Sequence, residues 1–417
     1  MSEPVTDPLP PAPSGDFVIT DAHVVPVEGE PFTGSVVVLG GRIAALGPGV
    51  RLPVYGDGHD PLPVVDAGGR WLLPGFVDAH THLGTHEEAQ GWAGNDTNEL
   101  TDPNTAGVRA IDAINPFDLG FDDALSGGIT AVNVNPGSGN PIGGLCVALH
   151  THGRVVDAMA LRSPSGLKSA LGENPKRVYG ERKQLPSTRL GVAGVIRGAL
   201  TEARDYLARQ AAVEPDGAPA ATDLRLEALS AVLRREIPWR QHCHRVDDIA
   251  TALRIADEFG YRLVIDHGTE AHLIADLLAA QDIPVLIGPL MTSRSKVELR
   301  ERSLANPGRL AEAGVEISII TDHPVVPVQY LVHQATLAVK EGLDPVTALR
   351  SITLHPARAM GVDDRIGSLA RGKSADLVLW SGDPLDVMQR AEQVWISGRP
   401  VYRWDADRRV GVVAPRI

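Results

Sequence analysis

The sequence predicts an α/β protein, a (β/α)8 barrel of the TIM type with a small β-sandwich built from both chain ends. Two observations predict this fold. The middle of the chain alternates amphipathic helical stretches with short β-branched runs, the pattern of strands joined by crossover helices. Both ends instead consist of short β-rich runs separated by turn residues.

About eight strands are expected in the middle of the chain, and this number over roughly 280 residues matches a closed barrel. FDDALSGGITAVNVNP and VDDIATALRIADEFGYRLVIDHG each show a helical stretch, a glycine stop and a strand, which implies a parallel sheet. An open doubly wound sheet is the alternative, but no glycine-rich nucleotide fingerprint follows a strand. The strands are expected near residues 72–79, 129–134, 145–149, 166–171, 238–242, 262–266, 284–288 and 316–321.

The two chain ends are predicted to pair in one small domain. Gly40-Gly41 between two apolar runs is a hairpin signal, and runs of the same texture return in ADLVLWSGDP and AEQVWISGRPVYR. The first residues, MSEPVTDPLPPAPSG, are proline-rich, with neither a basic start nor an apolar stretch. The expected division is a flexible tail over 1–15, sandwich parts over 16–72 and 361–417, and a metal-binding barrel over 73–360.

Composition limits the classes of partner. The 417 residues are 43% apolar, enough for a sizeable core, and their net charge of −13 argues against nucleic acid or an anionic membrane as a partner. The two cysteines, Cys146 and Cys243, suit a reducing cytoplasm, and no apolar run is long enough for a membrane span. We therefore expect a cytoplasmic protein that acts on a small molecule, with homo-oligomer formation left open.

The first barrel strand ends in a pair of histidines. In LLPGFVDAHTHLG, His80 and His82 alternate with Thr81, so both imidazoles point to the same face of an extended strand. At the carboxyl end of a barrel strand, that face lies at the active-site mouth. Two neutral imidazoles side by side suit zinc or a similar divalent ion.

Three further strands stop at residues of the same kind. The fifth ends in QHCHR with His242, the sixth in IDHGTE with His267, and the eighth in ITDHP with Asp322. Each position alone is compatible with a structural residue, but their recurrence at one strand end after another is improbable by chance. The pattern therefore predicts a divalent metal site at the barrel mouth.

The sequence resembles the amidohydrolase superfamily, most closely its imidazolonepropionase-like branch. The resemblance is carried by these strand-end motifs, above all PGFVDAHTH, and by the terminal segment LHPARAMGVDDRIGSLARGKSADLVLW. The resemblance covers nearly the whole chain. It implies that His80 and His82 hold one divalent ion and that His242 and His267 hold a second. Asp322 is then implied to bind metal and to move the proton. Zinc is the first expectation for the one or two ions, with manganese, iron and nickel as alternatives.

The resemblance also implies a bridging carboxylate, for which GLKSALGENPKR offers two residues, Lys168 in carboxylated form and Glu173. If Leu167 and Ser169 face the helices, Lys168 faces the barrel interior; the opposite parity would bury its charge among the helices at high cost. Glu173 instead stands where the strand ends. The sequence leaves this choice open.

Loops at the barrel mouth supply candidate substrate-binding residues. His86 follows the first strand and Asn140 lies in the glycine-rich stretch NPGSGNPIGG. His244 and Arg245 stand shortly after the fifth strand, where imidazolonepropionases and the related deaminases generally carry a glutamate. An imidazole and a guanidinium there favour a substrate with a carboxylate.

The predicted function is hydrolysis of an amide, peptide-like or cyclic amide C–N bond by metal-activated water, with esters not excluded. A deaminase on the same scaffold is one alternative, disfavoured by the missing glutamate. A non-catalytic barrel that serves binding or assembly is the other, and it would be expected to lose a metal ligand first. All five strand-end residues are present: His80, His82, His242, His267 and Asp322.

Overall fold

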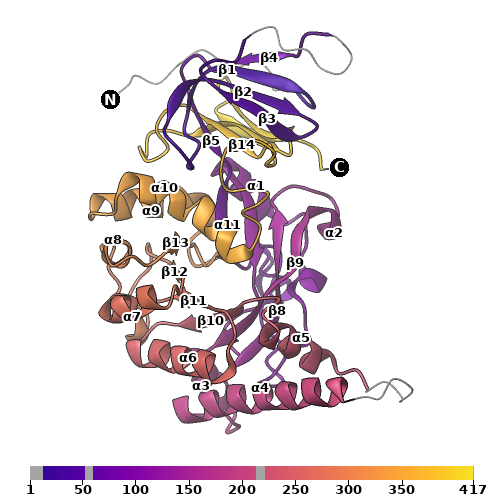
Figure 1. Ribbon diagram of the computed structural model, residues 1–417, viewed down its shortest axis with the longest axis vertical. Helices are drawn as coiled ribbons and strands as arrows, with labels where there is room; N and C mark the ends of the chain where they lie inside the picture. Colours follow the sequence, from indigo (N-terminus) through magenta and orange to yellow (C-terminus); the bar gives the residue numbers. More distant parts are fainter. Residues whose placement is uncertain (1–12, 52–59, 213–220, 417) are drawn as a thin grey trace.

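A computed structural model of the chain describes residues 13–51, 60–212 and 221–416. It contains two sheets, a barrel sheet and a second sheet that lies above it (Figure 1). Most of the predicted flexible tail, residues 1–12, lies outside the described residues.

The barrel sheet has eight strands in the order β13-β12-β11-β10-β9-β8-β7-β6. Each lies within or close to one of the predicted strands. Their bounds are β6 Phe76–Thr81, β7 Ile129–Val134, β8 Ile142–His150, β9 Ala160–Ala170, β10 Trp239–Cys243, β11 Leu263–His267, β12 Val285–Ile287 and β13 Ile317–Ile319.

One barrel strand departs from the predicted parallel arrangement. β8 is antiparallel to both β7 and β9, whereas the pairs from β9 to β13 are parallel. Only residues 135–141 connect β7 to β8. This glycine-rich link is too short for a crossover helix, so the two strands form a hairpin. A strictly alternating (β/α)8 order is therefore wrong for this part of the barrel.

Backbone hydrogen bonds near the carboxyl ends of β6 and β13 bring the two edges of the barrel sheet together. The Asp322 amide donates to the His80 carbonyl at 3.1 Å, and the His82 amide donates to the His323 carbonyl at 3.0 Å. These bonds join the end of β6 to the segment that follows β13. The closure brings residues from opposite ends of the sequence to one edge of the site.

Helices cover the outside of the barrel (Figure 1). In α6, Asp247 and Asp248 lie in the first turn, where carboxylates favour the helix dipole, and Gly260 ends the helix at φ +73°. The helices are α1 Leu119–Ser126, α2 Val156–Met159, α3 Glu173–Glu181, α4 Arg189–Ala211, α5 Leu224–Leu233, α6 Val246–Phe259, α7 Ala275–Ala280, α8 Asn306–Glu312, α9 Leu331–Lys340, α10 Pro345–Ser351 and α11 Leu354–Met360.

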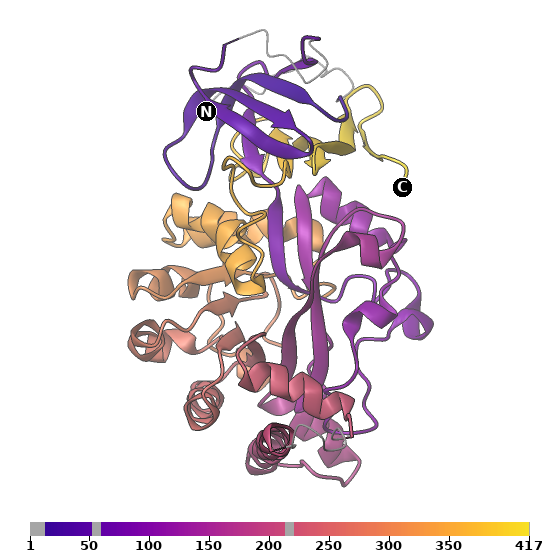
Figure 2. The same cartoon turned by 45° about the vertical axis from the view of Figure 1, so that its right-hand side comes forward.

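The second sheet is built from both chain ends, which lie side by side in Figure 2 as its indigo and yellow strands. β5 and β14 pair antiparallel and join the two halves. The structure supports a second sheet, and its description as a sandwich stays a prediction. Its strands are β1 Phe17–Val24, β2 Phe32–Leu39, β3 Arg42–Gly47, β4 Val64–Asp66, β5 Trp71–Pro74, β14 Leu377–Trp380, β15 Ala391–Ile396, β16 Arg399–Asp405 and β17 Val410–Val413.

A buried polar contact ties the barrel to this second sheet. His150, the last residue of β8, lies 2.9 Å from Asp376 through its Nε2. The carboxylate of Asp376 also accepts hydrogen bonds from the Ser374 hydroxyl at 2.6 Å and the Ser397 amide at 2.8 Å. The Asp376 carboxylate therefore joins the end of β8 to residues of the segments before β14 and after β15.

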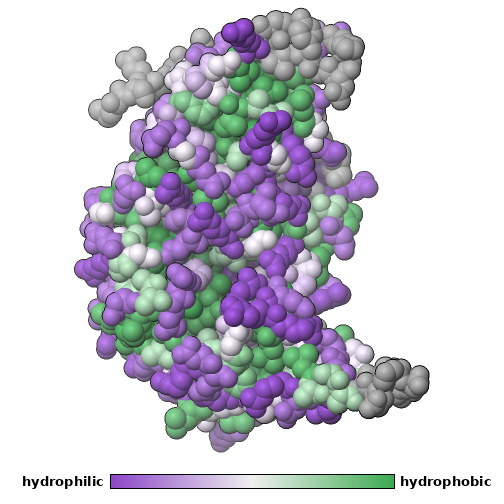
Figure 3. Space-filling model, viewed as in Figure 1, coloured by the Kyte–Doolittle hydropathy of each residue, from purple (hydrophilic) through white to green (hydrophobic). Residues whose placement is uncertain are grey.

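Apolar residues close the barrel floor. Val264, Leu286 and Ile320 form one buried cluster with Ala357 and Met360 of α11. On the face seen in Figure 3, hydrophilic and hydrophobic residues are interspersed over both sheets and the covering helices. Within the described ranges, no helix combines the length and apolarity needed to cross a membrane.

Candidate metal centre

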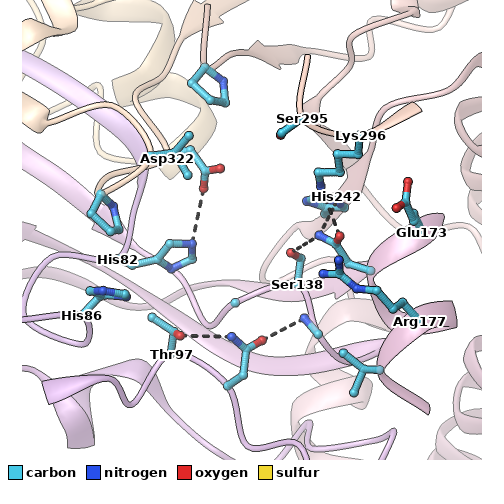
Figure 4. Close-up of a pocket in the computed structure, with 18 of the residues that line it drawn as sticks. His82, His86, Thr97, Ser138, Glu173, Arg177, His242, Ser295, Lys296 and Asp322 are labelled. Carbon is cyan, nitrogen blue, oxygen red and sulfur yellow. Dashed lines mark hydrogen bonds and ion pairs between the residues drawn. The ribbon is translucent and has the colours of Figure 1, made fainter. Parts of the chain in front are cut away.

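A cavity of about 630 Å³ lies at the mouth of the barrel (Figure 4). On one side, Figure 4 shows His82 and Asp322; on the other it shows His242, Lys296 and Arg177. These residues come from segments far apart in the sequence. The barrel therefore brings together imidazole, carboxylate and cationic groups around one open space.

The first group of convergent ligand atoms comprises His80, His82 and Asp322. Asp322 Oδ1 lies 3.3 Å from His80 Nε2 and 3.4 Å from His82 Nε2. His82 Nδ1 lies 2.8 Å from the Asn135 carbonyl, which can only accept, so this nitrogen carries the proton. In neutral His82, Nε2 is then an acceptor facing another acceptor, and a cation between them would satisfy both.

The second group comprises His242, His244 and His267. His242 lies 4.4 Å from His267 and 4.8 Å from His244 between ring centroids. His267 Nδ1 donates to the Gly288 carbonyl at 2.8 Å, which leaves Nε2 free as a ligand. His244 Nδ1 lies 2.9 Å from the Thr269 hydroxyl. The structure thus brings His244, predicted as a substrate residue, into a group of possible metal ligands.

Burial keeps the histidines of the second group neutral. It lowers the pKa of His267 to about 3 and holds the pKa values of His242 and His244 well below the usual value. Neutral imidazole is the form that binds a metal ion. Burial would raise the pKa of Asp322, but the surrounding histidines outweigh it and hold this pKa well below its usual range.

The donor set fits a divalent ion of the zinc type. At bond lengths near 2.1 Å, two tetrahedral ligand atoms are separated by about 3.4 Å. The separations of Asp322 Oδ1 from His80 and His82, 3.3 and 3.4 Å, match that value. Backbone carbonyls hold the Nδ1 protons of His82 and His267, which leaves the opposite nitrogens free as ligand atoms, as metal binding requires.

The two candidates for the bridging carboxylate lie in different surroundings. Lys168, 1% exposed, points into the barrel as the strand parity predicts, and its Nζ lies 3.2 Å from His80 Nε2. Glu173 begins α3 at the cavity wall, and its amide donates to Glu298 at 2.6 Å. Among the described residues, Glu173 belongs to neither group of convergent ligand atoms.

Asp78 joins the two strands that carry the first group. Its carboxylate accepts hydrogen bonds from the His80 amide at 3.1 Å and from the Thr321 hydroxyl at 2.5 Å. Burial raises the pKa of this carboxyl to about 7. Asp78 therefore holds the segment before His80 against the segment before Asp322.

The other predicted substrate residues lie in three different places. His86 lines the cavity. Asn140 is buried, and its amide donates to the carbonyls of Glu99 and Asp102, so it holds one loop against another. Arg245 pairs with Asp247 at 2.9 Å and lines a neighbouring hollow, so the structure does not bring it into the cavity.

Among the cavity-wall residues that the sequence did not predict are Asn174, Arg177 and Lys296. Arg177 on α3 and Lys296 after β12 both line the cavity. Asn174 lies beside Lys296: its amide donates to Ser138 at 2.9 Å, and its oxygen accepts from Lys296 at 3.1 Å. A helical cation and a loop lysine resemble ordinary surface residues in a sequence, so no signal separated them from the chain's other cations.

Comparison with known proteins places the chain in a family. The model of the amidohydrolase family matches residues 71–401. The chain therefore belongs to the amidohydrolase family, and it is a hydrolase of the class that acts on carbon–nitrogen bonds. The resemblance to the imidazolonepropionase-like branch is also confirmed.

Two relatives and one solved structure show how much of the chain is similar to known proteins. The chain is 29% identical over 413 residues to an imidazolonepropionase of Cupriavidus pinatubonensis, with 91% of each chain covered. It is 32% identical over 362 residues to the amidohydrolase tasK of Hapsidospora irregularis, covering 80% of this chain but 37% of that relative's length. A solved amidohydrolase from Thermotoga maritima is 44% identical with a TM-score of 0.89, covering 93% of this chain and 100% of that one.

Proposed function

We propose that the protein is a divalent-metal-dependent hydrolase that cleaves an amide-type or cyclic amide C–N bond in a small substrate carrying a carboxylate. The observation that carries this proposal is the convergence of His82 Nε2 and Asp322 Oδ1, two acceptors 3.4 Å apart at the end of a cavity. The names of the relatives, amidohydrolase and imidazolonepropionase, support C–N bond cleavage.

The ligands are assigned from the two groups. His80, His82 and Asp322 would hold one ion, and His242 and His267 would hold a second. Neutral imidazoles and an ionised carboxylate are the protonation states that such an ion needs, and the pKa directions of His242, His267 and Asp322 agree with it. Zinc is the first expectation from these ligand types, with manganese, iron and nickel as alternatives.

We assign the bridge to Lys168 in carboxylated form. Near the first group, the cations Arg240 and Lys168 balance the carboxylates Asp266 and Asp322, so divalent ions would add uncompensated positive charge. The ammonium of Lys168 first loses a proton, and the neutral amine then forms an N–C bond to carbon dioxide and releases a second proton. A cation is thereby replaced by an anion. The contact of Lys168 with His80 supports this role, and the position of Glu173 beside Glu298 does not favour the alternative.

Asp322 is assigned the proton transfer. The bound ions would supply activation of a water molecule and polarisation of the substrate carbonyl. Asp322 is ionised at neutral pH because its pKa is low, so it can accept a proton from that water and deliver it to the leaving nitrogen. His86 lines the same cavity and is available to contact the substrate.

Two cations are assigned to the substrate carboxylate. Lys296 and Arg177 lie on the wall of the cavity opposite His82 and Asp322 (Figure 4). In the described part of the chain, neither forms an ion pair with a carboxylate. A substrate carboxylate would therefore be the natural partner for both. These residues replace Arg245 in the role that the sequence suggested.

The test is metal analysis of the purified protein together with a substrate panel. We expect one to two equivalents of divalent metal, and loss of activity on chelation. The panel compares dipeptides, N-acyl amino acids and cyclic amides, each as the free acid and as the carboxamide. Hydrolysis of the free acids supports the proposal. Ammonia release from an amino-substituted ring would support a deaminase instead, and a protein without metal or turnover would contradict both.

Bicarbonate dependence tests the bridge. Protein purified without carbon dioxide should load metal more slowly, and added bicarbonate should restore loading. Lys168→Ala should lose metal and regain part of its activity with short carboxylic acids, whereas Glu173→Gln should keep its metal. The reverse pattern would assign the bridge to Glu173.

A further inference from the structure

Beneath the first ligand group lies a buried cluster in which two residues, Asp266 and Arg240, have no role in the proposed reaction. Asp266 on β11 and Arg240 on β10 are both 0% exposed, and Lys168 and His80 beside them are 1% exposed. Asp266 Oδ2 lies 3.1 Å from Lys168 Nζ and 3.2 Å from His80 Nδ1. One carboxylate oxygen thus contacts two residues assigned to the metal site.

The other oxygen of Asp266 is held by arginine. Arg240 donates to Asp266 Oδ1 through Nε at 3.1 Å and through Nη2 at 2.9 Å. The same Nη2 donates to the carbonyl of Ala79 at 2.8 Å, immediately before His80. Arg240 therefore connects β10, β11 and β6, and it leaves Oδ2 of Asp266 directed at Lys168 and His80.

Stability alone does not account for this cluster. Replacing buried ion pairs with apolar residues of similar size is often neutral or stabilising, because each buried charge loses its hydration. The neighbouring interior positions Val264 and Leu286 show that the barrel accepts apolar residues there. The presence of charged residues at this depth therefore needs an explanation other than stability. The contacts of Asp266 with Lys168 and His80 indicate that this explanation lies in the metal site.

We propose that Asp266, held in place by Arg240, is a positioning residue for two metal ligands at once. His80 Nδ1 is buried and has no hydrogen-bond partner within the described residues, and Asp266 Oδ2 lies 3.2 Å from it. Acceptance of the Nδ1 proton by Asp266 would fix the imidazole so that Nε2 presents its lone pair to the ion. Asp266 also accepts an N–H of Lys168, and the carbamate keeps one N–H after carboxylation. The inference rests on the proposed function, because Asp266 can position His80 and Lys168 for metal only if these two residues bind or bridge the ions.

The test uses the full-length protein and two readouts that need no substrate. Metal affinity is measured by titration of zinc against a chelating indicator. The carbamate is detected by ¹³C NMR after incubation with ¹³C-bicarbonate. The main variant is Asp266→Asn with Arg240→Gln, because it removes both members of the Arg240–Asp266 ion pair and leaves only Lys168 without its carboxylate partner. The matched control is Asp376→Asn, which breaks the other buried aspartate–histidine pair, with His150.

We expect the double variant to bind zinc roughly 10- to 100-fold more weakly, the usual effect of losing such a partner, and to lose the carbamate signal. The control should keep both. ¹⁵N NMR of the metal-free protein should show His80 protonated at Nδ1 in the wild type and as a mixture of tautomers in the variant. If the double variant does not fold, Arg240→Lys is used instead. It keeps the positive charge but loses the two parallel N–H donors of the guanidinium, and we expect it to bind zinc severalfold more weakly than the wild type.

Each outcome has a distinct meaning. A folded double variant with wild-type affinity and carbamate would overturn the positioning role and leave the proposed function intact. Wild-type protein that binds no divalent ion would overturn the proposed function and this inference with it. Metal bound without any carbamate in the wild type would overturn the part of the inference that concerns Lys168.

Discussion

Two buried aspartate–histidine pairs lie in different regions of the molecule. Asp266 faces His80 at 3.2 Å inside the barrel, and Asp376 faces His150 at 2.9 Å between the barrel and the second sheet. Both aspartates are buried, at 0% and 3% exposure. By burial and residue type alone, the two pairs are nearly the same.

Their surroundings differ in a way that separates a site from a structural contact. Asp376 receives neutral donors, the Ser374 hydroxyl and the Ser397 amide. Asp266 receives two cations, and the second nitrogen of its histidine lies 3.3 Å from the carboxylate of Asp322. The convergence of Asp322 Oδ1 with the Nε2 atoms of His80 and His82, 3.3 and 3.4 Å away, distinguishes the barrel site. A buried pair by itself does not indicate a metal centre.

The largest effect should come from removing the first ligand group. We expect His80→Ala with His82→Ala to weaken metal binding by roughly 100-fold or more, because two of the imidazole ligands are lost. Elemental analysis and circular dichroism check the metal and the fold. His150→Ala is the control from the other pair and should keep its metal. Full metal content in the double variant would contradict the ligand assignment.

The next effect concerns the proton. Asp322→Asn retains the shape and an oxygen ligand but removes the base, and we expect kcat to fall roughly 10²- to 10⁴-fold. Metal content should change much less. Near-normal turnover would mean that another group transfers the proton. His244 is the first candidate, because it lies in the second ligand group.

Much of this architecture could be predicted from the sequence, because strand ends carry a strong signal. His80 and His82 follow an apolar run with alternating parity, and Asp322 ends another. The direction of β8 was missed because an apolar run does not show which way a strand runs. The length of its connection, residues 135–141, was the available sign.

The recognition residues were harder to predict, since loop positions depend on tertiary packing. Arg245 follows a ligand strand directly, yet its side chain turns to Asp247. Lys296 reaches the cavity from a segment between β12 and α8 that has no clear pattern. Arg240 and Asp266 did leave a signal, because each is a charged residue inside a buried strand, in WRQHC and LVIDH.

A smaller effect is expected at the cavity wall. Lys296→Gln and Arg177→Gln should each raise KM for carboxylate substrates roughly 10- to 100-fold, as a charge-assisted hydrogen bond of about 1.5–3 kcal/mol is lost. KM for the matching carboxamides should hardly change, and kcat should fall less than KM rises. Steady-state kinetics on acid and amide pairs measure this split. Equal losses on both would show that these cations do not bind the carboxylate.

The smallest effect on catalysis is expected from the second pair. Asp376→Asn should lower the free energy of unfolding by about 1–3 kcal/mol, because a buried hydrogen-bonded carboxylate is replaced, while metal content and kcat stay unchanged. Burial would raise the pKa of Asp376, but His150 and the hydrogen-bond donors outweigh it and hold that pKa below its usual value. The folded state therefore binds the proton less readily than the unfolded state.

The stabilisation from Asp376 is accordingly complete above the unfolded pKa, near 3.9, and is lost as the pH falls toward the lower folded value. Urea unfolding of wild type and Asp376→Asn at pH 7, 5 and 4 should give nearly the same difference at pH 7 and 5. The difference should begin to shrink at pH 4. Asp376→Asn should keep its metal. If it loses metal as the double variant Asp266→Asn with Arg240→Gln is expected to, the two pairs are coupled and the distinction between them fails.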